Sequence, residues 1–336
     1  MLHTEIKSNP VETIFQLASG LWVSRALWAA ARLRLADLVG EQPVALDELA
    51  AAARAQPDML GRLMNALTSF GIFARTADGC FDHSELSRHL RSDHPASQRA
   101  IIESVFGHEH YEAWGAIEHS LCDGETAFDV VYDMPVFAWF SEQPASAKLF
   151  SEAMTSSTRM MEKELLAACD FGSFSLAVDV GGSQGSLLRG LLARHSHARG
   201  ILFDLPEIVD LVRPALKGSR IRGVSGNFFE AVPAGGDLYL LKFILHDWTD
   251  EQCGEILRNV RAAIAPAGRI AIAEIVLPEG GQPSPDYLMD LNMMVMTGGR
   301  ERTASEFDAL LRDAGFRMES VTATGAILSL IKAVAI

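Results

Sequence analysis

The sequence contains few cysteines, and they are far apart. Cys80, Cys122, Cys169 and Cys253 are the only four in 336 residues, and no C-x-x-C pair occurs. This spacing argues against a disulfide framework and against a zinc ribbon. The amino-terminal stretch also lacks the pattern of a secretory signal peptide. Together these features predict a cytoplasmic protein.

Long apolar runs and an excess of positive charge are missing as well. No run reaches the roughly 18 apolar residues that a membrane-spanning helix needs. Lys and Arg number 29 against 43 Asp and Glu, which gives a formal net charge of −14. A surface of this sign disfavours nucleic acid and anionic lipid. We therefore expect neither as a partner.

The first half of the chain begins with a long helical pattern over residues 14–39. It is apolar on more sides than a surface helix needs. We expect the apolar excess to pack against a second subunit. Burial inside a single chain is the alternative.

Two short helical patterns and a hairpin signal at Asp78-Gly79 follow, an order typical of a winged helix. Winged helices often bind DNA. Acidic and basic side chains are nearly balanced over residues 1–100, however, so the positive surface that DNA requires is missing. A structural or dimerisation module is the better interpretation.

Residues 97–168 read as further helices rich in aromatic side chains. We expect most of these aromatics to pack in a core, and a few, with Met154, to line an apolar pocket. Two H-x-H pairs, His108/His110 and His195/His197, have no cluster of Cys, Asp or Glu at ligand spacing. The sequence therefore predicts no metal.

The stretch LAVDVGGSQGSLLRGLL at 176–192 is the most informative in the chain. It predicts a buried strand, a turn of small residues and a helix, the opening of a nucleotide-binding βαβ unit. Gly181, Gly182 and Gly185 do not match the dinucleotide pattern G-x-G-x-x-G. With Asp179 they resemble D-x-G-x-G-x-G, the first motif of S-adenosylmethionine (SAM) methyltransferases. A turn without a ligand and a sugar-nucleotide site remain open at this point.

Acidic and basic side chains stand at the ends of the strands that follow. Asp204 closes the second strand, 19 positions after Gly185, where a carboxylate can accept hydrogen bonds from both hydroxyls of a ribose. The fourth strand carries Lys242, His246 and Asp247 at its carboxyl end, and Glu274 ends the fifth. Ligands of open α/β sheets bind at this edge, so these side chains are expected to converge on one crevice. Two final β-type runs predict an antiparallel pair that closes a seven-stranded sheet.

Taken together, the motifs resemble the plant-type small-molecule O-methyltransferases and their bacterial relatives in natural-product tailoring. The matching stretches are DVGGSQG, FDLPEIV, SGNFFE, LLKFILHDWTDEQC, AEIVLP and GGRERT, in the order and spacing of that family. The resemblance implies an α/β fold, with a Rossmann-like, seven-stranded class I methyltransferase domain after an all-α, winged-helix dimerisation domain. The implied boundaries are 1–95 for dimerisation, 96–168 for a helical linker at the substrate pocket, and 169–336 for the catalytic domain.

The resemblance also implies a role for individual residues. SAM would be the cofactor and S-adenosylhomocysteine (SAH) its product. Gly181, Gly182, Gly185, Asp204, Asn227, Phe228 and Lys242 would bind the cofactor, His246 would be the general base flanked by Glu274 and Glu301, and Phe150, Met154, Asn292, Met293 and Met296 would lie near the acceptor. The chain would form a homodimer through its N-terminal domain. Two departures stand out: Ser183 replaces a glycine of the motif, and Asn227 replaces an acid.

The implied reaction is methylation of a hydroxyl on an aromatic small molecule: a phenazine, a quinone, a polyketide-like ring or a simple phenol. A histidine beside a carboxylate suits the removal of the hydroxyl proton. N-methylation, or hydroxylation or decarboxylation with SAM bound, is the alternative on the same fold. A regulatory binding protein and an NAD-dependent oxidoreductase are weaker alternatives, because the base is present and the glycine spacing is wrong for NAD.

Overall fold

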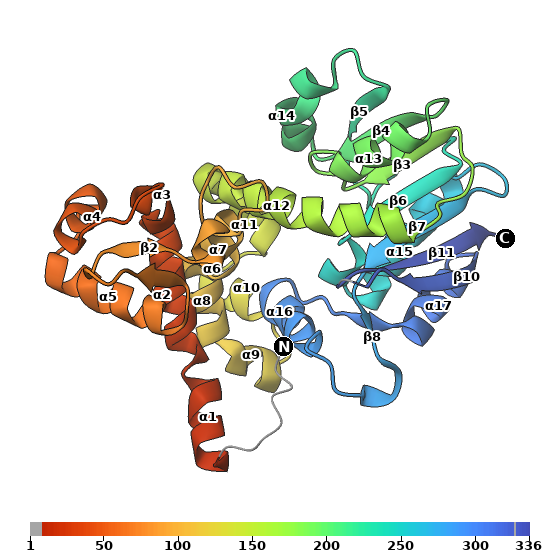
Figure 1. Ribbon diagram of the computed structural model, residues 1–336. Coiled ribbons are helices and arrows are strands. Elements are labelled where there is room, and N and C mark those ends of the chain that lie inside the picture. The colour runs from red at the N-terminus through yellow and green to blue at the C-terminus, as the bar shows by residue number, and fades with distance from the viewer. Residues whose placement is uncertain (1–8, 326) are drawn as a thin grey trace. The chain divides into compact units, whose positions relative to one another are not determined.

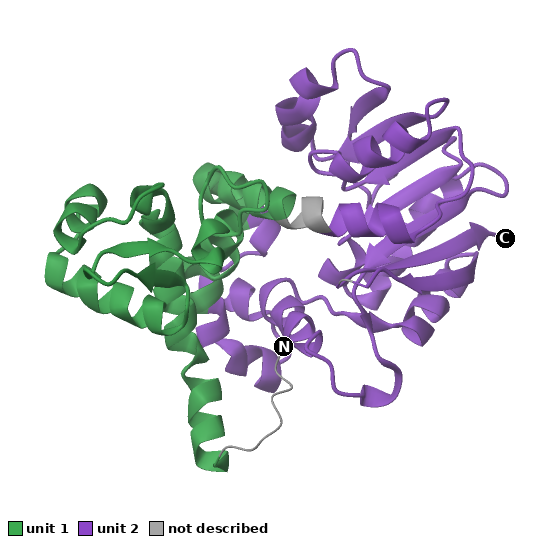
Figure 2. Cartoon of the chain, in the orientation of Figure 1, with its two compact units in different colours: residues 1–112, 139–157 green, residues 113–138, 158–336 purple. Residues whose placement is uncertain are grey.

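The computed structural model describes residues 9–325 and 327–336, without the side chains of residues 157–160. Contacts within the chain divide it into two compact units, shown in different colours in Figure 2. Unit 1 contains the residues up to Glu112 and Trp139–Ser157; unit 2 contains Ala113–Ala138 and Thr158–Ile336.

Unit 1 is built from short helices and one hairpin. Its elements are α1 Pro10–Ala18, α2 Gly20–Arg32, α3 Leu35–Val39, α4 Leu46–Ala53, α5 Pro57–Ser69, β1 Phe73–Arg75, β2 Phe81–His83, α6 Glu85–Arg88, α7 Arg99–Val105 and most of α8 His108–Gly115. The strands β1 and β2 pair antiparallel on either side of the Asp78-Gly79 turn, as the hairpin signal predicts. A core that includes Leu35, Leu49 and Phe81 joins the helices to the hairpin. The winged-helix arrangement is therefore present.

The helical pattern over 14–39 is not one helix. A break at Ser19 separates α1 from α2, and Leu33-Arg34 separate α2 from α3. Arg34 has a left-handed backbone with φ 55°, which a continuing α-helix does not tolerate. Sequence periodicity missed these breaks because the apolar spacing continues across them.

The helical stretch 96–168 is shared between the units. In unit 2 lie α9 Ile117–Cys122 and α10 Ala127–Tyr132, while α11 Val136–Glu142 and α12 Pro144–Ala168 have residues in both. Within unit 2, α9 and α10 contact α16 Tyr287–Met296. The three-part division of the chain stays a prediction.

Unit 2 contains the seven-stranded sheet. Its strands are β3 Leu176–Val180, β4 Arg199–Asp204, β5 Ile221–Ser225, β6 Leu238–Lys242, β7 Arg269–Glu274, β10 Phe316–Ala323 and β11 Ser329–Ala335. The order is β10-β11-β7-β6-β3-β4-β5, which Figure 1 shows running from one edge to the other. Strands β3 to β7 are parallel, and β11 pairs antiparallel with both β7 and β10. The predicted sheet and its antiparallel edge are confirmed.

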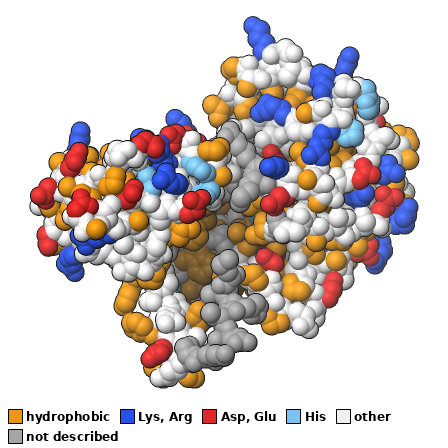
Figure 3. Space-filling model, in the orientation of Figure 1, with side chains coloured by type: hydrophobic (Ala, Val, Ile, Leu, Met, Phe, Trp, Pro, Cys, Tyr) orange, Lys and Arg blue, Asp and Glu red, His pale blue; other side chains and the backbone are white. Residues whose placement is uncertain are grey.

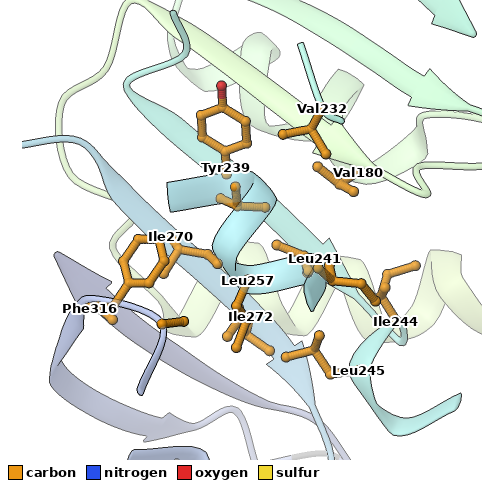
Figure 4. Packing of buried hydrophobic residues seen from close by; sticks show 14 of the residues in the cluster. Val180, Val232, Tyr239, Leu241, Ile244, Leu245, Leu257, Ile270, Ile272 and Phe316 are labelled. Atoms are coloured by element: carbon orange, nitrogen blue, oxygen red, sulfur yellow. The ribbon is translucent and has the colours of Figure 1, made fainter. Parts of the chain in front are cut away.

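Two apolar cores cover the two faces of this sheet. On one face the strands pack against α15 Asp250–Ala263 and α17 Ala304–Asp313. On the other they pack against the end of α12, α13 Ser186–Arg194 and α14 Pro206–Leu216. Alternate residues of each strand serve alternate cores, as the pleat of a strand requires. Figure 4 shows Ile244 and Leu245, which follow β6, among the side chains of the first core.

Four short elements complete unit 2. They are η1 Leu245–Asp247, η2 Glu279–Gly281, β8 Val276–Leu277 and β9 Arg302–Thr303. The last two pair in parallel, which brings the chain after β7 to the GGRERT segment. Across the described residues, no helix combines the length and apolarity needed to span a bilayer.

Candidate active site

The glycine turn after β3 is shaped by contacts that leave no room for side chains. Gly181 has φ 66°, and a Cβ there would lie 2.4 Å from Ile244 Cδ1. A Cβ on Gly182 would lie 2.6 Å from Asp179 Oδ2. A side chain at either position would force Ile244 or Asp179 to move, and the left-handed backbone of Gly181 favours glycine as well. A turn of bare backbone at the carboxyl end of β3 is the cradle that a nucleoside-bearing ligand needs.

Ser183 and Asp204 connect this turn to the end of β4. Ser183 adopts the left-handed region with φ 50°, which explains why the related motif has glycine there. Its backbone N–H donates to Asp204 Oδ2 at 2.7 Å, and Leu205 N–H donates to Asp204 Oδ1 at 2.8 Å. A carboxylate oxygen can accept more than one hydrogen bond, so the side chain is oriented and still able to bind a hydroxyl.

Asn227 and Phe228 follow β5. The Oδ1 of Asn227 accepts the backbone N–H of Phe229 at 3.0 Å, which leaves its amide N–H and a second lone pair to offer. Phe228 Cε1 lies 3.9 Å from where a Cβ on Gly181 would stand. The structure thus brings Phe228 beside the glycine turn.

Lys242, the last residue of β6, lies among buried acids. Burial lowers the pKa of its ammonium, and the nearby charges of Glu162, Asp179 and Glu274 raise it in part. Asp179 is 2% exposed, and burial raises the pKa of its carboxyl to about 7. Glu162 could not be predicted from the sequence, because a lone glutamate in a charged helix gives no signal.

His246 lies on η1, immediately after β6, and is 8% exposed. Its Nδ1 is 2.9 Å from Glu301 Oε1 and 3.8 Å from Glu274 Oε2. The ring stacks on Phe243, with centroids 5.0 Å apart. A carboxylate that accepts the Nδ1 proton fixes the tautomer, so Nε2 carries the lone pair that takes up a proton.

The loop that carries His246 is held through its backbone. Glu274 Oε1 accepts the N–H groups of Ile244 and Leu245 at 3.0 and 2.9 Å. The N–H of Arg300 donates to the carbonyl of His246 at 2.9 Å. Glu274 therefore contacts the histidine with one oxygen and holds the preceding loop with the other.

Arg302 and Gly299, which were not among the predicted site residues, complete this support. The fully buried guanidinium of Arg302 donates to the carbonyls of Leu245 and Trp248 at 2.9 and 2.8 Å. A Cβ on Gly299 would stand 2.0 Å from the carbonyl oxygen of His246. The sequence signal for both residues is their place in the GGRERT motif, beside Glu301.

Three acidic side chains, those of Asp247, Glu274 and Glu301, surround His246. Burial lowers the pKa of the imidazole, but the charges of Asp247, Glu274 and Glu301 outweigh it and raise that pKa to about 10. Burial raises the pKa of Asp247 to about 6, and it also raises the pKa of Glu274. One oxygen each of Glu274 and Glu301 is buried without a hydrogen-bond partner among the described residues.

His246, Glu274 and Glu301 are also of the residue types that bind metals. Ligand atoms of His246, Glu274 and Glu301 all lie within 4.8 Å of one another. The expectation that no metal takes part stays a prediction.

The residues expected near the acceptor fall in both units. In unit 2, Asn292 Oδ1 accepts the indole N–H of Trp114 at 3.0 Å, and Met293 and Met296 are buried on the same helix, α16. The N–H of Glu301 donates to Asp290 Oδ1 at 2.9 Å, which ties α16 to the GGRERT segment. From sequence alone Trp114 is one of many aromatic residues in 97–168, so its contact with Asn292 could not be predicted.

Phe150 and Met154 lie in the unit 1 part of α12. The ring of Phe150 stacks on that of Phe140, with centroids 4.7 Å apart, and Met154 is half-buried. Their role in acceptor binding stays a prediction.

The fold and the site together are those of a class I methyltransferase. The parallel sheet has a glycine turn after its first strand, and a buried histidine–carboxylate group lies at the ends of neighbouring strands. Residues 114–317 match the O-methyltransferase domain, and residues 15–93 match the O-methyltransferase dimerisation domain. The chain belongs to the O-methyltransferase family and is a SAM-dependent O-methyltransferase, related to those of bacterial natural-product biosynthesis.

Curated relatives cover nearly the whole chain. Phenazine O-methyltransferase PhzM of Lysobacter antibioticus is 38% identical over 95% of both chains. O-demethylpuromycin-O-methyltransferase of Streptomyces alboniger is 39% identical over 92% of this chain and 85% of its own. An N,N-dimethyltransferase of 8-amino-8-demethylriboflavin from Streptomyces davaonensis is 29% identical over 96% and 94%.

Solved structures agree with the fold. The crystal structure of LaPhzM has a TM-score of 0.94 at 37% identity, over 98% of this chain and all of that one. NcsB1 from neocarzinostatin biosynthesis, in complex with SAH and 1,4-dihydroxy-2-naphthoic acid, has a TM-score of 0.80 at 29% identity, over 94% and 96%.

Proposed function

We propose that this chain methylates a hydroxyl oxygen of an aromatic small molecule, with His246 as the general base. The observation that carries the proposal is the 2.9 Å contact between His246 Nδ1 and Glu301 in a buried loop. It leaves Nε2 as the proton acceptor, and Glu301 stabilises the imidazolium that forms.

The proposed chemistry needs a base because a neutral hydroxyl is a weak nucleophile. SAM supplies a methyl group on a sulfonium, which an oxygen attacks in line. A phenol has a pKa of about 10 and free imidazole one of about 6.5, a poor match for proton transfer. The carboxylates that raise the pKa of His246 to about 10 remove this mismatch. General-base assistance is worth about 10²–10⁴ in rate.

The residues proposed to hold SAM fit it. The bare turn at Gly181, Gly182 and Gly185 admits a ligand close to the backbone, and Asp204 is oriented to accept ribose hydroxyls. Phe228 offers an aromatic face beside the turn and Asn227 an amide, both suited to adenine. Lys242 contributes a cation to the cofactor side of the site.

An aromatic acceptor is supported by the chemistry of α16 and by the relatives. Met293 and Met296 are adaptable apolar side chains, and Trp114 adds a flat one. Relatives act on a phenazine and on O-demethylpuromycin, and NcsB1 binds a dihydroxynaphthoic acid. We infer a phenolic, phenazine-, quinone- or polyketide-like hydroxyl as the substrate class.

We propose that the reaction needs no metal. The separation of His246 Nδ1 and Glu301 Oε1 is that of a hydrogen bond, and Glu274 Oε1 already accepts two backbone N–H groups. Treatment with EDTA is expected to leave turnover unchanged. Loss of activity that added Mg²⁺ or Zn²⁺ restores would refute this point.

N-methylation is the second candidate, since the riboflavin-related N,N-dimethyltransferase shares the fold and most of the length. An amine is already nucleophilic when neutral, so it does not need the base that His246 provides. Matched pairs of aryl hydroxyls and aryl amines, incubated with methyl-labelled SAM and analysed by mass, separate the two reactions. We expect a mass gain of one methyl on the hydroxyl member. Methylation only of the amine would overturn the proposal, and oxidation or loss of CO₂ would indicate the other chemistries.

A further inference from the structure

Helix α12 brings a buried carboxylate to the beginning of α13. Glu162 is 6% exposed, and its Oε1 accepts the hydroxyl of Ser186 at 2.7 Å. The backbone N–H of Leu187 also donates to this carboxylate. Ser186 and Leu187 are the first two residues of α13, directly after the glycine turn. Glu162 therefore occupies the amino terminus of the helix that follows β3.

In dinucleotide-binding folds, this helix terminus binds the phosphate groups of the ligand. In this chain the carboxylate of Glu162 occupies that position instead. A ligand phosphate at this position would meet the charge of Glu162 in a buried environment, where like charges repel strongly. The amino terminus of α13 is thus unsuited to a phosphate, because Glu162 already balances its partial positive charge.

The surrounding charges point in the same direction. Glu162 and Asp179 are both buried, and Lys242 interacts with both of them. The charge of Arg189 also acts on both carboxyls, yet burial still raises the pKa of each, so their ionised forms lack full compensation here. Buried charge is costly unless it is paired, so a cationic ligand group would stabilise the arrangement.

We propose that Glu162 is a binding residue for the α-ammonium group of the methionine portion of SAM. The inference rests on the proposed seat of the cofactor at the glycine turn. In this proposal α12 recognises the ammonium group of the ligand, which the glycine motif does not do by itself. Hydrogen bonds between charged groups of this kind change affinity by about 10- to 100-fold.

Calorimetric titration with three ligands tests the proposal without any acceptor. The ligands are SAH, an SAH analogue that lacks only the α-amino group, and one that lacks only the α-carboxylate. We expect the wild-type protein to bind SAH about 10- to 100-fold more tightly than the desamino analogue. Equal affinity for SAH and the desamino analogue would overturn the proposal without recourse to any variant.

The variant Glu162→Gln keeps an acceptor for Ser186 and removes the charge. It is expected to lose the preference for the amino group while keeping any preference for the carboxylate. Glu164→Gln, which removes the same charge from an exposed position on the same helix, is the matched control and keeps the wild-type preference. An equal loss for all three ligands in Glu162→Gln would show a structural role and overturn the proposal. If wild-type protein binds no SAH, the proposed function fails instead.

Discussion

Gly299 lies against the backbone of the loop that carries His246. Its position explains why the GGRERT segment has a second glycine at this point. A Cβ there would also stand 2.5 Å from the carbonyl carbon of Asp247. Backbone atoms cannot yield as the end of a flexible side chain does, so the catalytic loop itself would have to move.

We predict that Gly299→Ala lowers kcat at least about tenfold, because small displacements of a base are costly in rate. Overpacking also destabilises the fold by about 1–3 kcal/mol. Steady-state kinetics and denaturant unfolding measure the two effects. Gly115→Ala is the control, since a Cβ at Gly115 meets no described atom within 4 Å. Wild-type kcat in Gly299→Ala would contradict the account.

Ser183 is one of the described non-glycine residues with a left-handed backbone. A left-handed conformation costs an L-residue about 1–2 kcal/mol, whereas glycine loses about 0.5–1 kcal/mol more backbone entropy on folding. We predict that Ser183→Gly is neutral or stabilises the protein by up to about 1 kcal/mol. Urea unfolding checks this prediction. A clear loss of stability would show that the serine side chain contributes to the turn.

At the scale of elements, the candidate site is a junction between two loops. The loop after β6 supplies His246, and the segment before α17 supplies Glu301 and Arg302. Glu274, at the end of β7, contacts both the histidine and the backbone before it. The base is therefore positioned by backbone hydrogen bonds as much as by its own side chain.

This arrangement predicts an alkaline pH dependence. Neutral imidazole is the base, and its pKa of about 10 means that kcat/KM rises with pH toward that value. The same raised pKa stabilises the folded state below about pH 6.5, and this contribution is lost as pH rises through about 10. Glu301→Gln removes one of the charges that hold the pKa up.

We therefore expect Glu301→Gln to shift the rising limb of kcat/KM toward neutral pH. The pH profile of both proteins, each saturated with SAM, makes the comparison. Glu255→Gln, an exposed charge change on α15, is expected to leave the limb in place. An unshifted limb in Glu301→Gln would show that Glu301 does not set the pKa of the base.

Whether a site residue could be predicted from sequence depends on the element that carries it. Strand ends are local signals, so Asp204, Lys242, His246 and Glu274 could be placed on one edge of the sheet from apolar runs alone. Glu162 could not, because its partner Ser186 lies 24 residues away in the chain. Arg302 could be placed only through the GGRERT motif, because the carbonyl it contacts, that of Leu245, lies 57 residues away. The break between α2 and α3 could not be predicted, because Arg34 adopts a left-handed backbone and no glycine marks that position in the sequence.

At the scale of the whole molecule, the helix α1 has no buried side chain among the residues that the structure describes. Each of its large apolar side chains is exposed, including Ile14 at 69% and Phe15 at 62%, and Trp22 on α2 is exposed at 66%. Apolar side chains are visible on the surface along this helix in Figure 3. A contiguous apolar face of this kind marks a protein interface, and the match to a dimerisation domain supports a homodimer.

We predict that Phe15→Glu converts a dimer into monomers, because a charge would be buried in the interface without a partner. Light scattering at micromolar concentration measures the mass. Leu211→Glu places the same charge on an exposed leucine of unit 2 and is expected to remain dimeric. A wild-type monomer, or an unchanged dimer of Phe15→Glu, would contradict this prediction.

The proposed reaction depends on His246 removing the proton of the acceptor hydroxyl. The most direct test compares the wild-type protein with His246→Ala on a series of phenols whose pKa values run from about 10 down to about 7. The account predicts unchanged SAM affinity, a loss of about 10²–10⁴ in kcat for the weakest acids, and a smaller loss as the phenols become more acidic. Near-normal kcat in His246→Ala on the least acidic phenol would contradict it.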